Sequence, residues 1–172
     1  MEILLLVIVL LPLLTALGIK LVDRFINKFL LNLLTINSAL LSFLTASGMF
    51  LLLTSNKFEP IHFKFFTWLT TPEILFEFTL DGLSGIMMVL VTGLSVVIQI
   101  FSTSYMSKDE NYSKYFVYFN FFVFSMLLLV MSGNFLVLFF GWELVGLSSY
   151  LLISFSCLHE TLEQFVDTQM AL

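Results

Sequence analysis

Residues 135–155 form an apolar run, FLVLFFGWELVGLSSYLLISF, that is long enough to cross a lipid bilayer as a single helix. Glu143 lies close to the middle of this run. An ionised carboxylate in the hydrocarbon layer is costly, and the acids that membrane helices retain are mostly functional. Glu143 is therefore the first candidate for a functional residue, and the question is which group balances its charge.

Four further apolar runs precede this one, at about residues 3–19, 29–53, 82–104 and 115–131. Hydrophobic residues make up 59% of the 172 residues and charged residues only 11%, whereas soluble domains have roughly a quarter charged residues. A chain of this composition cannot hide its apolar surface in its own core, so lipid must cover it. The sequence predicts an all-α polytopic membrane protein, with about five transmembrane helices in one membrane domain over residues 1–172.

The connection between the second and third spans has a different pattern. Residues 63–65 and 76–81 alternate between apolar and polar side chains, and the stretch 70–73, TTPE, between them is typical of a turn. We expect a β-hairpin outside the bilayer, with a role in docking; the alternative is a structured interfacial loop with buried aromatic side chains. Asp81, just before the third span, is expected to cap that helix.

The segment after the fifth span, residues 156–172, is not apolar enough for a sixth span. Its apolar side chains fall on one helical face and its acids on another. We expect an acidic amphipathic C-terminal helix, at the membrane surface or against a partner.

All seven basic residues lie outside the predicted spans. The loop after the first span has three of them, the loop at residues 105–114 has two, and the long connection with the hairpin has two; the turn between the fourth and fifth spans has none. The positive-inside rule places the first and third loops on the matrix or cytoplasmic side. The N-terminus and the hairpin are then expected on the opposite side.

Residue types that hold redox groups or metals are scarce. The single cysteine, Cys157, excludes an internal disulfide and a cysteine cage, and the two histidines are not part of a ligand-spaced cluster. There is neither a glycine-rich nucleotide-binding motif nor a basic patch for nucleic acid. We expect no metal and no cofactor bound to this chain.

Between residues 115 and 158, Glu143 is the only ionisable acid or base apart from tyrosines and Cys157. On a helix, Gly146 and Tyr150 fall near the same stripe as Glu143. We therefore expect the carboxylate to point into a helix bundle rather than into lipid. Trp142 is expected to be a packing anchor, and Ser149 and Tyr150 to serve helix contacts or to hold water. The small residues that permit close helix approach here are Gly141, Gly146, Ser148 and Ser149.

Two interpretations of Glu143 remain open. It is either a protonated, hydrogen-bonded packing residue, or a group that titrates during a transport cycle. In the second case, a cation that moves toward or away from the carboxylate would unload and load a proton. No lysine or arginine lies within a predicted span, so such a cation would have to belong to another chain.

Three stretches resemble one known family. Residues 140–155, FGWELVGLSSYLLISF, closely resemble the fifth-helix signature of NADH dehydrogenase (ubiquinone) subunit 5, the distal antiporter-like membrane subunit of respiratory complex I. Residues 78–84, FTLDGLS, resemble the start of the family's third helix, and residues 104–130 resemble its third loop and fourth helix. The similarity extends over about residues 81–155, whereas the first two spans and the hairpin agree only in pattern.

The resemblance implies a proton-translocating, multi-pass subunit of NADH:ubiquinone oxidoreductase in the mitochondrial inner membrane. It implies that Glu143 is the proton-path carboxylate, paired in the family with a lysine on helix seven; Trp142, Gly146, Ser149 and Tyr150 are the supporting residues. NADH, FMN, iron–sulfur clusters and ubiquinone are expected in the whole complex and not in this chain. The implied partners are the other membrane-arm subunits and lipids, without nucleic acid.

The sequence also departs from the family. Subunit 5 has well over a dozen helices, and neither the lysine-bearing helix seven nor the long lateral helix has a counterpart here. We expect an N-terminal fragment of a subunit split into two polypeptides, with residues 156–172 docked on the second. The alternatives are a truncated structural or assembly subunit that no longer pumps, and a subunit of a multisubunit cation/proton antiporter or a membrane-bound hydrogenase.

Overall fold

A computed structural model describes the backbone of residues 2–23, 27–55, 59–70, 73–107, 109 and 111–170. Within these ranges it describes the side chains except those of residues 2–3, 66, 68–70, 73–74 and 156–170.

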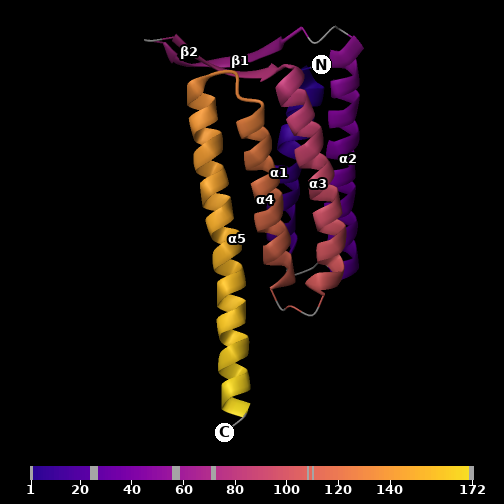
Figure 1. Ribbon diagram of the computed structural model, residues 1–172, viewed down its shortest axis with the longest axis vertical. Helices are drawn as coiled ribbons and strands as arrows, with labels where there is room; N and C mark the ends of the chain where they lie inside the picture. Colours follow the sequence, from indigo (N-terminus) through magenta and orange to yellow (C-terminus); the bar gives the residue numbers. More distant parts are fainter. Residues whose placement is uncertain are drawn as a thin grey trace.

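The described residues form five helices that lie side by side (Figure 1). They are α1 Glu2–Val22, α2 Lys28–Ser55, α3 Gly82–Tyr105, α4 Tyr112–Val130 and α5 Phe135–Met170. Each has a stretch long and apolar enough to cross a membrane, which confirms the predicted polytopic all-α class. The largest difference at a helix start is in α4, which begins at Tyr112 instead of near residue 115.

The fifth span and the C-terminal segment form one continuous helix. Figure 1 shows the lower part of α5 projecting beyond the ends of the other helices. No glycine or proline occurs after Gly146, so nothing in the backbone interrupts the helix. The predicted C-terminal helix therefore continues α5 instead of forming a separate element, and its predicted amphipathic faces lie outside the described side chains.

The helices pack in a fixed order. α4 packs against both α1 and α5, and α2 packs against α1 and α3. Between α3 and α4 the buried amide of Gln99 donates from Nε2 to Oδ1 of Asn120 at 3.2 Å. Toward one end of the same interface the hydroxyls of Ser102 and Tyr115 lie 2.9 Å apart. The interior of the bundle (α1 to α5) thus contains polar groups that meet across helices.

The predicted hairpin is confirmed. β1 Ile61–Thr70 and β2 Glu73–Leu80 pair antiparallel and lie across one end of the bundle (Figure 1). Phe63, Phe78 and Leu80 are buried in the core that continues into the helices. Apolar side chains on one face of the hairpin therefore attach it to the bundle. The expected turn at residues 70–73 has its central residues, 71–72, outside the described part.

The α4–α5 turn is joined to the hairpin by backbone hydrogen bonds. The Thr79 N–H donates to the Met131 carbonyl at 2.9 Å, and the Gly133 N–H donates to the Glu77 carbonyl at 3.0 Å. A Cβ atom at Gly133 would lie 2.7 Å from Glu77 Cγ and 2.9 Å from its carbonyl oxygen. Because atoms of Glu77 occupy that space, the turn between the fourth and fifth spans needs glycine at this position.

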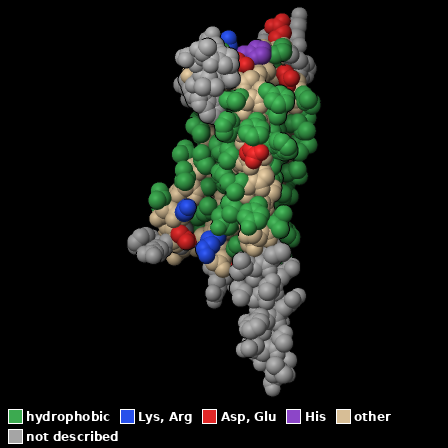
Figure 2. All heavy atoms as spheres, turned by 90° about the vertical axis from the view of Figure 1, so that its left-hand side faces the viewer, with side chains coloured by type: hydrophobic (Ala, Val, Ile, Leu, Met, Phe, Trp, Pro, Cys, Tyr) green, Lys and Arg blue, Asp and Glu red, His purple; other side chains and the backbone are tan. Residues whose placement is uncertain are grey.

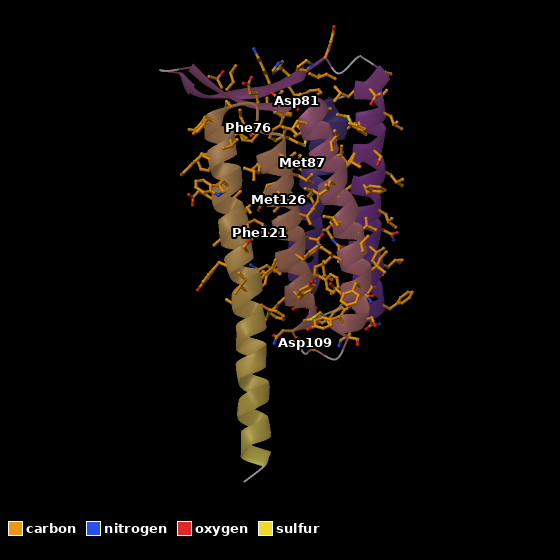
Figure 3. The ribbon with its side chains drawn as sticks, viewed as in Figure 1. Phe76, Asp81, Met87, Asp109, Phe121 and Met126 are labelled. Atoms are coloured by element: carbon orange, nitrogen blue, oxygen red, sulfur yellow. The ribbon has the colours of Figure 1, made fainter. Side chains whose placement is uncertain are left out.

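The two ends of the bundle differ as the charge pattern predicted. Asp81 caps α3 beside the hairpin: the Ser84 N–H donates to Asp81 Oδ1, and the Asp81 N–H donates to Ser84 Oγ, both at 2.7 Å. At the opposite end the Lys28 ammonium donates to the Ser107 carbonyl at 2.7 Å. Figure 3 shows Asp81 and Asp109 at these opposite ends. The hairpin thus lies away from the first and third loops; the identity of the matrix side stays a prediction.

Candidate functional site

The two faces of α5 have different surroundings. One face is in the core: Val137 and Ser148 are fully buried, and Leu144 and Leu152 pack partly buried against the same cluster. These positions are four or seven residues apart, so they form one helical stripe. α4 is the helix against which α5 mainly packs. We call this stripe the inner face of α5.

At Gly141 the inner face comes very close to the backbone of α4. A Cβ atom there would lie 2.7 Å from Leu129 Cα and 2.8 Å from Leu129 N. These are backbone atoms of α4 and cannot turn aside, so the contact needs a residue without a side chain. The predicted role of small residues in helix approach is correct for Gly141 and for the buried Ser148.

Glu143 lies on the opposite side, which we call the outer face of α5. Its side chain is exposed, and Figure 2 shows an isolated acidic patch in the middle of a hydrophobic surface. Glu143 is eight residues from the start of the span, roughly 12 Å along the helix axis. The expectation that the carboxylate points into a bundle is therefore wrong for the described helices, because the stripe that contains it points away from α4.

The supporting residues mostly share the outer face. Trp142 is 63% and Tyr150 68% exposed, and a Cβ atom at the position of Gly146 would have nothing within 4 Å. Gly146 therefore does not mediate close approach to any described helix. Ser149 is half-buried at the edge between the two faces. Within the described residues, the expected packing anchor Trp142 and the expected helix contact of Tyr150 have no helix to pack against.

Several interhelical polar contacts were not singled out from the sequence. Gln99 is 1% exposed and Asn120 is 1% exposed, and their hydrogen bond lies inside the membrane-spanning part of the bundle. The signal was available, because a side-chain amide among long apolar runs is expected to face another helix. These residues join α3 to α4 and leave Glu143 as a separate polar site.

Among the described residues, no group of three or more His, Cys, Asp or Glu side chains lies close enough to hold a metal ion. The outer face combines one carboxylate with an indole and a phenol within the apolar span, and the Ser149 hydroxyl lies at its edge. The carboxylate can hold a proton, and the other groups have donors and acceptors for water once a neighbour excludes lipid.

Comparison with known proteins identifies relatives over most of the chain. A family model described as NADH-Ubiquinone oxidoreductase (complex I), chain 5 N-terminus, matches residues 68–116. NADH-quinone oxidoreductase subunit L of Buchnera aphidicola is 38% identical over 86% of this chain and 24% of its own length. NADH-ubiquinone oxidoreductase chain 5 of Dictyostelium discoideum is 42% identical over 55% of this chain and 14% of its own length. The chain thus spans a quarter or less of these relatives.

A solved structure shares the fold. It is a chain of the membrane-bound sulfane sulfur reductase, an archaeal respiratory membrane complex, with a TM-score of 0.75 and 21% sequence identity. The match covers 87% of this chain and 30% of that chain. At this identity the similarity concerns the arrangement of the helices and not the chemistry.

Proposed function

Because this chain is a homologue of the N-terminal part of the complex I subunit 5/L family, we propose that it forms the first helices of a proton-translocating subunit of NADH:ubiquinone oxidoreductase. Glu143 is the carboxylate of its proton path. The proposed location is the mitochondrial inner membrane, and the redox groups of the enzyme belong to other subunits. The chain is a multi-pass membrane protein by its span-length helices and its relatives.

The observation that supports this proposal best is the position of Glu143. A carboxylate on an uncovered apolar face in the middle of a span would be costly against lipid. The cost is removed if further helices cover the outer face and bring a cation or water to the carboxylate. A group held in this way changes its proton affinity whenever the cation moves, which is the basis of a proton-translocation step.

The proposed partner is therefore the rest of the subunit fold, packed on the outer face of α5. In the split-subunit hypothesis it is a second polypeptide with an intramembrane lysine, and the acidic segment at residues 156–172 docks on it. A photo-crosslinker in place of Tyr150 should capture that polypeptide in the purified complex, whereas a crosslinker in place of Ser148 should react only within this chain. Capture of lipid alone at position 150 would contradict the proposal.

A second candidate function would use the same residue. A subunit of a multisubunit cation/proton antiporter would use the same carboxylate for sodium-linked exchange. Complex I inhibitors should abolish proton transport in the first case, whereas sodium should drive it in the second. A structural or assembly subunit, the third alternative, would transport nothing through this chain.

The direct experiment is Glu143→Gln in the assembled complex, reconstituted in vesicles with NADH and a quinone as substrates. We expect proton translocation per NADH oxidised to fall, because glutamine keeps the shape and hydrogen-bonding capacity but cannot release a proton at physiological pH. Glu143→Asp should retain part of the pumping. Normal pumping by a fully assembled Glu143→Gln complex would reject the proposed role and favour the assembly alternative.

A further inference from the structure

A cavity of about 280 Å³ lies at the end of the bundle that is remote from the hairpin. It lies between the C-terminal end of α1 and the first turns of α4, two segments far apart in sequence. By volume it has room for a group of many atoms, since a single water needs only about 10–15 Å³. The residues that line it are Lys20, Asp23, Ser113, Lys114, Val117 and Tyr118.

Most of the lining surface is apolar, and the charged groups among its described residues have a net positive charge. Lys20 and Lys114 contribute two ammonium groups against one carboxylate, Asp23. Lys114 Nζ donates to Asn111 Oδ1 at 2.8 Å, which uses one of its three donor hydrogens. Ser113 and Tyr118 add hydroxyl donors. Among the described residues, the remaining donors and the excess of one positive charge match a singly charged anion with several acceptor oxygens.

The position of the cavity, at the ends of two spans, indicates where that anion comes from. α1 ends at Val22 and α4 begins at Tyr112, so the cavity lies where both spans leave the apolar layer. On the adjacent turns of α1, Leu14, Leu17 and Leu21 are exposed. Figure 2 shows basic and acidic side chains gathered at the lower edge of a hydrophobic surface. A polar head next to an apolar wall is the geometry of a phospholipid.

We propose that this cavity binds the phosphodiester of a membrane glycerophospholipid, with Lys20 and Lys114 on the phosphate oxygens and the acyl chains along α1. Basic pockets between membrane helices are a known class of headgroup site, and lysine binds phosphate as a point charge. The Ser113 and Tyr118 hydroxyls hold the remaining oxygens. The site is remote from Glu143 in the fold and does not depend on the proposed function.

The test uses the purified complex and a phosphatidylglycerol with a photoreactive acyl chain. In the wild type, peptides from the end of α1 and the start of α4 should be labelled. Lys20→Gln/Lys114→Gln should reduce that labelling by about tenfold, because two charge-assisted hydrogen bonds are lost. Lys64→Gln removes a positive charge at the hairpin end of the bundle and should leave the labelling unchanged. Lys20→Arg/Lys114→Arg keeps the charge and should retain most of it.

A competition experiment distinguishes binding of a lipid from binding of free phosphate. Unlabelled phosphatidylglycerol in excess should suppress the labelling, whereas inorganic phosphate at the same concentration should not, and a photoreactive diacylglycerol without phosphate should not label these peptides. Labelling that persists in the assembled Lys20→Gln/Lys114→Gln complex would overturn the proposal. Suppression by inorganic phosphate as strong as that by the lipid would also overturn it, because the site would then bind the ion alone.

Discussion

Polar side chains have different surroundings in the interior of the bundle and on the outer face of α5. In the interior, Gln99 and Asn120 are buried and meet each other across two helices, and Ser148 donates to the Val145 carbonyl of its own helix at 3.0 Å. On the outer face, Glu143 and Tyr150 are exposed within an apolar span. The interior pair meets within the described helices, although Gln99 Oε1 has no hydrogen-bond partner there. The outer face has no described helix against it, and the neighbour that covers it is our proposal.

The difference shows how one helix can serve two purposes. The inner face of α5 fits closely against α4, and at Gly141 the contact leaves no room for a side chain. The outer face has no such fit to any described helix, yet it has the only acid of the span. Packing therefore explains the sequence of the inner face, and the outer face is explained by the proton-path role that we propose.

The largest expected effect is the difference in stability between Gly141→Ala, on the inner face, and Gly146→Ala, on the outer face. A methyl group at position 141 would lie 2.7 Å from a backbone atom of α4, so α5 must shift, at a cost of about 2 kcal/mol. The same methyl group at position 146 meets nothing within 4 Å and should stabilise the helix by about 0.5–1 kcal/mol, since alanine has the higher helix propensity. Thermal unfolding in detergent measures both.

The outcome at position 146 also sharpens the comparison. If Gly146→Ala does not destabilise the chain but weakens assembly of the complex, a neighbouring helix approaches the outer face closely. Equal destabilisation by the two substitutions would contradict the distinction between the faces.

A second, smaller effect is expected inside the bundle. Asn120→Leu removes the acceptor of the Gln99 amide and leaves a buried donor unpaired, which should cost about 1 kcal/mol. Gln99→Leu/Asn120→Leu removes both partners and should recover part of that loss. The unfolding free energies of the wild type, Asn120→Leu, Gln99→Leu and the double variant give the coupling energy between the two positions. No coupling between the positions would show that the interior polar pair is not a stabilising contact.

The smallest expected effect concerns Asp81, an acid whose hydrogen-bond partners lie within this chain. Hydrogen bonds from the Ser84 backbone and hydroxyl hold the pKa of the Asp81 carboxyl below its usual value. The ionised cap therefore stabilises the fold above the unfolded-state pKa, near 3.8, and this stabilisation is lost as the pH falls through the lower folded-state pKa.

Asp81→Asn keeps an acceptor at the cap but does not titrate. Its stability should therefore fall less steeply than that of the wild type below about pH 4, and Asp81→Ala should cost about 1 kcal/mol at neutral pH. Thermal unfolding as a function of pH gives both values. Parallel pH curves for Asp81→Asn and the wild type would contradict the capping account.

Much of the architecture could be predicted because it depends on local pattern. The spans follow from long apolar runs, the hairpin from the alternation at residues 76–81, and the cap from Asp81 three residues before Ser84. The continuity of α5 through residue 170 was missed because a change in composition was interpreted as a change of element. The backbone has no glycine or proline there to end a helix.

The surroundings of the site could not be predicted in the same way. Helical periodicity placed Glu143, Gly146 and Tyr150 on one stripe, which is correct, but it does not specify which neighbour that stripe faces. The direction depends on α4 meeting Gly141, and therefore on the turn at Gly133 and its bonds to the hairpin. The basic cavity was missed for a similar reason, because Lys20 and Lys114 meet only in the folded chain.

The most direct test of the proton-path role is difference infrared spectroscopy of the complex during turnover. We expect a carboxylic-acid band that changes when NADH is added, is absent in Glu143→Gln, and is shifted in Glu143→Asp. Such a band would show that this carboxyl gains and loses a proton during the cycle. A spectrum that is identical in the wild type and an active, assembled Glu143→Gln complex would contradict the account.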